Sequence, residues 1–279
     1  MIKTTDFIKA SNDGVFKGLF GNKKNKDLLE KLLEETLKRK VEVKNLLMQE
    51  IPKESIEEKD KTLDVLVLAD GEKINIELNI GVYDGLYNRN ACYIFGKYVG
   101  SVKPGESYKN MNNFIQINLT SGLSKDKPIV SKYELIDINT KKRFIKNLEI
   151  FEFNLDKIKD MCYNEGMEEY RILATLMCDR EELHNICKGD KVLEKLESEV
   201  IRMNEDDQIR ENLLAIENAK RVHATLMENA KEEGLAEGLA EGSKQKEIEI
   251  AKNMLTENTD IDFISKVTSL TKEEIESLK

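Results

Sequence analysis

The sequence is short of the residues that build zinc sites, disulfide frameworks and membrane spans. Its four cysteines show no Cys-x-x-Cys spacing, and its two histidines, His184 and His223, lie far apart in the chain. These absences argue against a zinc site. No apolar run approaches the roughly 18 residues of a membrane span, and the first residues include no apolar stretch that fits a signal peptide. We therefore expect a soluble protein of a reducing, cytoplasmic compartment.

Aromatic residues and prolines are also scarce. Tryptophan is absent, proline occurs three times, and aromatic residues make up 6% of the chain, against 35% charged and 40% hydrophobic residues. This composition favours helices rich in Glu, Lys and Leu over a β-sandwich. The 279 residues are enough to bury a core in one large domain or two small ones. We expect a folded protein in which helices dominate by residue count.

The acidic charge is concentrated at the C-terminal end. Of the formal net charge of -9, residues 205–279 carry -8, from 18 acidic and 10 basic residues, which leaves -1 for residues 1–204. A nearly neutral body can present a local basic groove to a nucleic-acid backbone, but it lacks the strongly basic signature of a dedicated nucleic-acid binder. Net charge therefore neither supports nor excludes DNA as a partner.

A β-hairpin is the clearest local signal. The segments TLDVLVLA and EKINIELNI flank Asp70-Gly71, and Asp-Gly between β-branched runs is typical of a two-residue hairpin turn. The numbers of paired residues then sum to 141, as those of Asp70 and Gly71 do. This register places Asp64 opposite Glu77, with their β-carbons about 4.5–5.5 Å apart. The apolar residues fill the other face of the hairpin.

Two like charges opposite each other destabilise a sheet unless a cation or solvent separates them. Mg²⁺ or Mn²⁺ held by Asp64 and Glu77 would meet that need, because such a metal polarises a phosphate and lowers the pKa of an attacking water. Asn79, on the same face as Glu77, is placed to orient the water or the phosphate. The alternative is that these acids are the solvated face of a half-buried hairpin. Spacing alone does not decide between the two.

The remaining pattern predicts a mixed sheet with helices on its faces, an α/β or α+β fold followed by a helical C-terminal region. A leucine-rich helix covers 27–38, and strands cover 113–119, 130–138 and 148–155. In the segment after the hairpin, Arg89, Tyr93 and Lys97 are spaced four apart, which places them on one face if the segment is helical.

The C-terminal end contains the repeat GLAEGLAEG at 234–242, which we interpret as a connector that is either a flexible or a closely packed helix. Three short helices follow it, and Thr271 and Glu274 form a capping box for the last one. A helix-turn-helix is disfavoured, because an acidic recognition helix is repelled by phosphates. We expect self-association or protein binding instead. The predicted divisions are a core at 1–155, a helical region at 156–233 and a small module at 234–279.

Six segments together resemble a known family. They are N-D-G-V-F-K-G-L-F (12–20), T-L-D-V (62–65), I-N-I-E-L-N (74–79), Y-N-R-N-A-C-Y (87–93), P-G-E-S-Y (104–108) and I-x-x-x-T-x-L-T-x-E-E-I (264–275). In order and spacing, they are similar to the PD-(D/E)XK nuclease family transposases, also called recombination-promoting nucleases.

The resemblance implies a restriction-endonuclease-like fold and a Mg²⁺- or Mn²⁺-dependent DNA endonuclease linked to recombination or a mobile element. It carries Asp64 and Glu77 over as the metal-binding pair and the Leu78 carbonyl as a further ligand. Asn79 stands at the third catalytic position, where the broad superfamily has Lys and this branch usually has Gln. Asn is one methylene shorter than Gln, so its amide reaches less far.

Four further residues are candidates for auxiliary roles. Lys97 would supply the cation that Asn79 lacks, and Lys17 and Arg89 would contact phosphates, although each can equally be an ordinary surface charge. Asp13 is either an extra acid from the first helix or the N-cap of that helix. Two other classes of function stay open: a catalytically weakened relative that acts as a DNA- or protein-binding scaffold, and a helical assembly protein.

Overall fold

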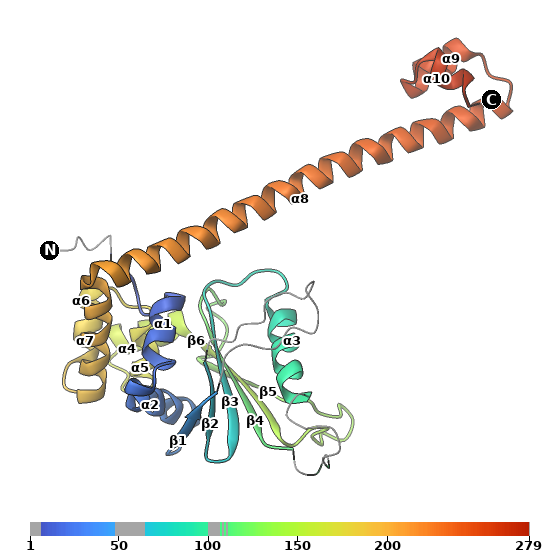
Figure 1. Cartoon of the computed structure of the whole chain (residues 1–279). Coiled ribbons are helices and arrows are strands. Elements are labelled where there is room, and N and C mark those ends of the chain that lie inside the picture. The colour runs from blue at the N-terminus through green and yellow to red at the C-terminus, as the bar shows by residue number, and fades with distance from the viewer. Residues whose placement is uncertain (1–6, 48–64, 100–106, 108, 110, 279) are drawn as a thin grey trace. The chain divides into compact units, whose positions relative to one another are not determined.

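The computed structural model describes residues 7–47, 65–99, 107, 109 and 111–278. The chain forms two compact units, Met1–Leu213 and Leu214–Lys279. In chain order, the elements of the first unit are α1 (Asp13–Phe20), the 3-10 turn η2 (Lys23–Asn25), α2 (Lys26–Leu37), β1 (Val43–Leu46), β2 (Val65–Ala69), β3 (Glu72–Asn79), α3 (Leu86–Val99), β4 (Phe114–Thr120), β5 (Val130–Tyr133), β6 (Leu148–Asn154), α4 (Leu155–Asn164), α5 (Arg171–Thr175), α6 (Arg180–Cys187) and α7 (Lys191–Glu205) (Figure 1). The second unit contains most of α8 (Asp207–Thr256), with α9 (Ile261–Thr268) and α10 (Lys272–Glu276).

The first unit is built around a six-stranded sheet in the order β1-β2-β3-β4-β6-β5. The central strands β3, β4 and β6 run parallel to one another, and the outer pairs are antiparallel. Helices lie on both faces of this mixed sheet (Figure 1). The predicted fold class, a mixed sheet flanked by helices with a helical C-terminal region, is confirmed.

The predicted hairpin register is confirmed for the described pairs. They run from Val65–Ile76 to Ala69–Glu72. Asp70 and Gly71 have φ angles of 50° and 81°, and two consecutive positive φ angles are what a two-residue turn between twisted strands requires. Asp64 lies outside the described residues, so its pairing with Glu77 stays a prediction.

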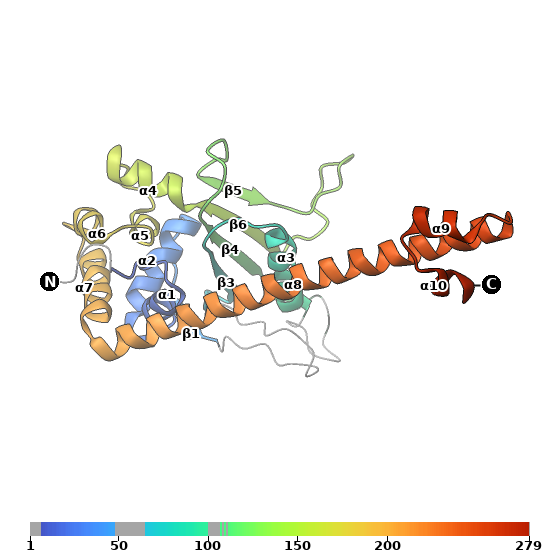
Figure 2. The ribbon, with the colours of Figure 1, turned by 90° about the horizontal axis from the view of Figure 1, so that it is seen from above.

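One face of the sheet packs into the main hydrophobic core. On the hairpin, Val65, Val67, Ile74 and Ile76 are 0% exposed. They belong to one cluster with the apolar sides of α1, α2 and α4–α7, and these helices lie together on one side of the sheet (Figures 1 and 2). The cluster continues to Leu213, so the helices after residue 155 share the core of the sheet. The expected domain boundaries at residues 155 and 233 stay predictions.

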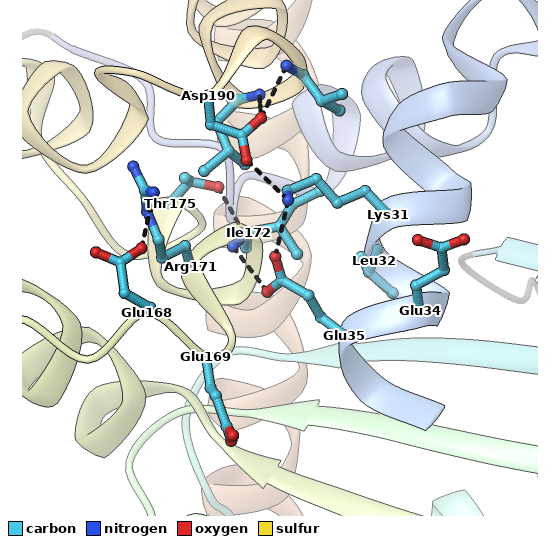
Figure 3. Close-up of polar contacts among 12 residues, drawn as sticks. Lys31, Leu32, Glu34, Glu35, Glu168, Glu169, Arg171, Ile172, Thr175 and Asp190 are labelled. Carbon is cyan, nitrogen blue, oxygen red and sulfur yellow. Dashed lines mark hydrogen bonds and ion pairs between the residues drawn. The ribbon is translucent and has the colours of Figure 1, made fainter. Parts of the chain in front are cut away.

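A partly buried charge network joins three elements of this helical layer (Figure 3). Lys31 Nζ on α2 lies 2.9 Å from Asp190 Oδ2 at the N-cap of α7 and 3.4 Å from Glu35 Oε1. The backbone N–H of Ile172 on α5 donates to Glu35 Oε2 at 3.2 Å. Burial raises the pKa of Glu35, and the charge of Lys31 partly opposes that rise. The network fixes α2 against α5 and α7.

The other face of the sheet is covered by α3 (Figure 1). Leu66, Ile94, Phe114 and Leu148 form a small apolar cluster there. Phe114, the first residue of β4, pairs with Lys73 near the start of β3 on one side and with Leu148, the first residue of β6, on the other. This cluster therefore anchors α3 at one end of the parallel strands. The opposite end carries polar side chains.

The second unit is a long helix followed by two short ones. The α8 helix continues through the glycine repeat to Thr256, so the prediction of a separate first short helix after the repeat is wrong. Apart from the adjacent residues and the nearby backbone of α8 itself, no described atom lies within 4 Å of the Cβ positions that Gly234, Gly238 and Gly242 would have, so the repeat is helical but not closely packed. The predicted Thr271–Glu274 capping box is confirmed. Among the described residues, no helix combines the length and apolar character needed to cross a membrane.

Candidate active site

Rows of buried polar side chains cross the three parallel strands on the face that α3 covers. Because β3, β4 and β6 pair in register, partners on neighbouring strands point to the same face. The rows are Asn75–Gln116, Glu77–Asn118–Glu152 and Asn79–Thr120–Asn154. Each of these side chains is at most 4% exposed. A buried polar layer is costly unless its members bond to one another, so its hydrogen bonds decide what it does.

Glu77 is held by neighbouring amides. Asn75 Nδ2 donates to Glu77 Oε1 at 3.1 Å and to Gln116 Oε1 at 2.9 Å. Gln116 Nε2 donates in turn to Asn118 Oδ1 at 2.8 Å. Glu77 is 0% exposed, so it is not part of a solvated face. Asn75 thus holds one oxygen of a fully buried carboxylate, and Gln116 and Asn118 continue the hydrogen-bond chain from Asn75.

Arg89 brings a positive charge to the same place. It lies on α3, and its Nη2 is 3.8 Å from Glu77 Oε2. Its Nε donates to the Tyr93 hydroxyl at 3.3 Å, and its guanidinium carbon is 4.8 Å from the centroid of that ring. Burial alone would lower the pKa of Arg89, but Tyr93 and the charge of Glu77 raise it above its usual value. Arg89 therefore remains a cation beside the carboxylate.

Asn79 lies between the helix and the sheet. Its Oδ1 accepts from Arg89 Nη1 at 3.2 Å, and its Nδ2 donates to Thr120 Oγ1 at 3.4 Å. With an exposed fraction of 3%, the amide is fixed by these two contacts. Among the residues that the structure describes, Arg89 is the cation that contacts the Asn79 amide.

Lys97, the residue that we expected to supply this cation, lies further along α3. Its pKa is lowered by burial and by the charge of Lys73, the second residue of β3, whereas Asn79 ends that strand. Its auxiliary role stays a prediction.

Asp13 and Lys17 lie on α1, across the sheet from α3 (Figure 1). The N-cap of α1 is Asn12, whose Oδ1 accepts from the backbone N–H groups of Gly14 and Val15. The N-cap interpretation of Asp13 is therefore wrong, because Asp13 is already the first helical residue. Its carboxylate pairs with Lys17 Nζ at 2.9 Å. The proposed contacts of these two residues with substrate or metal stay predictions.

Two further polar residues on this face were not found from the sequence. Glu152, 2% exposed, accepts hydrogen bonds from the hydroxyls of Tyr133 and Tyr87 at 2.7 and 3.4 Å. Asn90 of α3 is 3% exposed, and its amide atoms bond to none of the described residues. A charged residue between two phenylalanines, in the strand sequence IFEF, was the available signal for Glu152. For Asn90, we find no signal in the helical pattern.

The donors at Glu77 fit a hard divalent cation. The carboxylate of Glu77 and the amide oxygens of Asn79 and Asn118 are oxygen ligands, the type that Mg²⁺ and Mn²⁺ prefer, and none is a sulfur or imidazole ligand of the kind typical of zinc. In the part of the chain that the structure describes, no three His, Cys, Asp or Glu residues form a group able to hold a metal. A second carboxylate would have to come from residues such as Asp64, beyond that part.

Residues 10–230 match the model of one protein family, the PD-(D/E)XK nuclease family transposases. The chain belongs to this family. The matched range includes the whole sheet and α3, and with them Glu77, Asn79 and Arg89. Membership supports a nuclease or transposase-like function, and nucleases of the PD-(D/E)XK type typically use divalent metals. Neither a curated protein nor a solved structure matches the chain.

Proposed function

We propose that the protein is a Mg²⁺- or Mn²⁺-dependent DNA endonuclease that acts in recombination or for a mobile element. The observation that carries this proposal is the setting of Glu77, a fully buried carboxylate bonded by Asn75 and faced by Arg89 at 3.8 Å. A buried charge with this many dedicated partners is typical of functional sites. Family membership supports the nuclease class.

In this proposal, Asp64 and Glu77 hold the metal, with the Leu78 carbonyl as a further ligand. When bound there, such a cation would polarise the scissile phosphate and lower the pKa of the attacking water. Asn75 prevents the Glu77 carboxylate from turning away, because its amide occupies one of the two carboxylate oxygens. The Glu77 carboxylate is therefore oriented before the substrate binds, so little conformational entropy is lost in orienting it during the reaction.

Arg89 and Asn79 act on the phosphate. The guanidinium of Arg89 presents donors that match phosphate oxygens and stabilises the negative charge that grows on them. Arg89 cannot be a general base, because it does not lose its proton in proteins. Asn79, held by Arg89 and Thr120, orients the water or the phosphate. Arg89 thus takes the place of the cation that the usual lysine supplies.

Self-association through the C-terminal helices is a further part of the proposal. Leu235 and Leu239 on α8 are 63% and 67% exposed, and apolar side chains spaced four apart on a helix form a stripe that a second helix can cover. DNA is the proposed substrate, no membrane partner is proposed, and the cytoplasm is the proposed compartment.

A plasmid-nicking assay tests the activity. The full chain should nick supercoiled DNA with Mg²⁺ or Mn²⁺, and Asp64→Ala and Glu77→Gln should each lower the rate by about 10²-fold or more. Asp70→Asn is the matched control, because it removes an acid at the turn of the same hairpin and Asn tolerates the positive φ there. It should leave the rate unchanged.

The alternative is a catalytically weakened scaffold, which the engaged and short Asn79 favours. If the parent chain stays at the background of Asp64→Ala with both metals, the endonuclease proposal is wrong and the scaffold takes its place. Asn79→Gln and Asn79→Lys test an intermediate case, in which the site is intact except that the side chain of Asn79 is too short. Either variant should raise cleavage if only reach is missing.

A further inference from the structure

Glu152 lies in the row of Glu77 but outside the proposed metal site. Its register partner on β4 is Asn118, which pairs on its other side with Glu77. Because neighbouring strands are about 4.7–4.9 Å apart, Glu152 lies about 10 Å from Glu77 along the row. A stacked DNA strand covers that distance in about three nucleotides. Groups around Glu152 are therefore within reach of a strand whose phosphate meets Glu77.

Two tyrosine hydroxyls converge on one oxygen of Glu152. Tyr133 on β5 donates to Oε2 at 2.7 Å, and Tyr87 on α3 donates to the same oxygen at 3.4 Å. Burial and the hydrogen bond to Glu152 raise the pKa of Tyr133 to about 12, and burial and the charge of Glu152 also raise the pKa of Tyr87. Both hydroxyls therefore stay protonated donors at neutral pH. A buried carboxylate thus holds two aromatic rings from different elements.

Both tyrosines remain open to solvent, with exposed fractions of 47% for Tyr87 and 36% for Tyr133. Lys127 adds a cation: its Nζ donates to the Tyr133 hydroxyl at 3.3 Å and lies 5.8 Å from the centroid of that ring. Exposed aromatic rings beside basic side chains are the combination on which single-stranded nucleic acids bind, with bases stacking on rings and phosphates meeting cations. In a duplex, neighbouring bases cover each base face, so such rings act on bases outside the stack.

We propose that Tyr87 and Tyr133, held by Glu152 and flanked by Lys127, bind unpaired bases of the DNA strand that is cleaved. The substrate is then single-stranded DNA, or duplex DNA with a single-stranded segment such as a flap or a bubble. This inference rests on the proposed function, because the strand is defined by the phosphate that reaches Glu77. Glu152 acts as a positioning residue, since rings fixed before binding lose less conformational entropy when a base arrives.

Binding measurements separate this inference from cleavage. The full chain carrying Glu77→Gln is titrated into a fluorescein-labelled oligonucleotide, either single-stranded or annealed to its complement, and fluorescence anisotropy is recorded. The single strand should bind more tightly. Tyr87→Leu and Tyr133→Leu should each weaken single-strand binding by about 10-fold or more and leave duplex binding unchanged.

Two controls separate the effect of the aromatic ring from the effect of the hydroxyl group and from the effect of removing any exposed tyrosine. Tyr87→Phe and Tyr133→Phe keep the stacking face but lose the hydrogen bond to Glu152, so each should lose less single-strand affinity than the corresponding Leu variant. Tyr163→Leu removes a tyrosine of similar exposure, 39%, from α4 on the other side of the sheet (Figure 1), and should change nothing. If Phe proves as damaging as Leu, or if both DNA forms lose affinity equally, the inference is overturned.

Should Tyr133→Leu fail to fold, photocrosslinking replaces it. A single strand substituted with bromodeoxyuridine should crosslink to peptides that contain Tyr87 or Tyr133, and crosslinks confined to other peptides would overturn the inference. A nicking assay of the parent chain in parallel distinguishes the two proposals. If the tyrosine variants lose single-strand binding but the parent cleaves nothing with Mg²⁺ or Mn²⁺, the endonuclease proposal is wrong and the base-binding site stands.

Discussion

The strand β3 presents isoleucines to one face of the sheet and polar groups to the other, and both sets are fully buried. Ile74 and Ile76 pack into the main core with the α1, α2 and α4–α7 helices, whereas Asn75 and Glu77 lie under α3 in the polar rows. The apolar face excludes water and stabilises the fold. The polar face holds a carboxylate and an arginine that a purely structural layer would not need. Burial alone therefore does not tell which side of a sheet is structural.

The largest difference in the free energy of unfolding should appear between variants of two adjacent residues of β3. Ile76→Ala removes buried methyl groups and leaves a cavity, so it should lower the free energy of unfolding by about 2–5 kcal/mol. Glu77→Gln keeps the shape and removes a buried charge whose desolvation already costs stability, so its effect should be smaller than that of Ile76→Ala. Urea unfolding followed by circular dichroism measures both. A loss for Glu77→Gln equal to that of Ile76→Ala would make Glu77 part of the structural core.

Variants of Arg89 test the function of the polar face alone, through the rate of cleavage. Arg89→Met keeps an unbranched apolar stem but removes the cation beside Glu77 and the donor to Asn79, so cleavage should fall by about 10²-fold because growing phosphate charge loses its partner. Arg89→Lys should recover part of this activity, since it restores charge without the planar fork. Nicking rates with Mg²⁺ measure the series. Full activity in Arg89→Met would remove Arg89 from the site.

A loss of stability smaller than that of Ile76→Ala is expected in the charge network of the helical layer. Lys31→Met removes the cation shared by Glu35 and Asp190, so it should lower the free energy of unfolding at neutral pH by about 1–3 kcal/mol. The double variant Lys31→Met with Glu35→Gln should regain part of that loss.

The pH dependence of this effect follows from Glu35. Its pKa in the folded protein is raised above the ordinary value of 4.5. A raised folded pKa contributes stability that is fully present below that ordinary value and is lost as the pH rises through the folded pKa. Without Lys31, the pKa rises further, so the deficit of Lys31→Met should shrink as the pH is lowered towards about 4.5. A deficit that is constant with pH would show that Glu35 is not the group involved.

Local patterns in the sequence predicted the elements whose formation depends on neighbouring residues. The Asp-Gly turn and the period-2 alternation predicted the hairpin register, because a turn of two residues leaves no freedom in the pairing of its strands. Residue spacing placed Arg89 and Tyr93 on one face of a helix, where they now contact each other. The same reasoning missed the continuity of α8, because glycines lower helix propensity without forbidding a helix.

By itself, the sequence determined the family segments, the hairpin and the position of Glu77 on its polar side. Tertiary structure alone decided which side chains surround Glu77. Asn118 and Glu152 join its row because parallel strands pair in register across crossovers of many residues, and no local pattern sets that register. Arg89, rather than Lys97, meets Asn79 because the packing of α3 on the sheet selects which turn of the helix faces the ends of the strands.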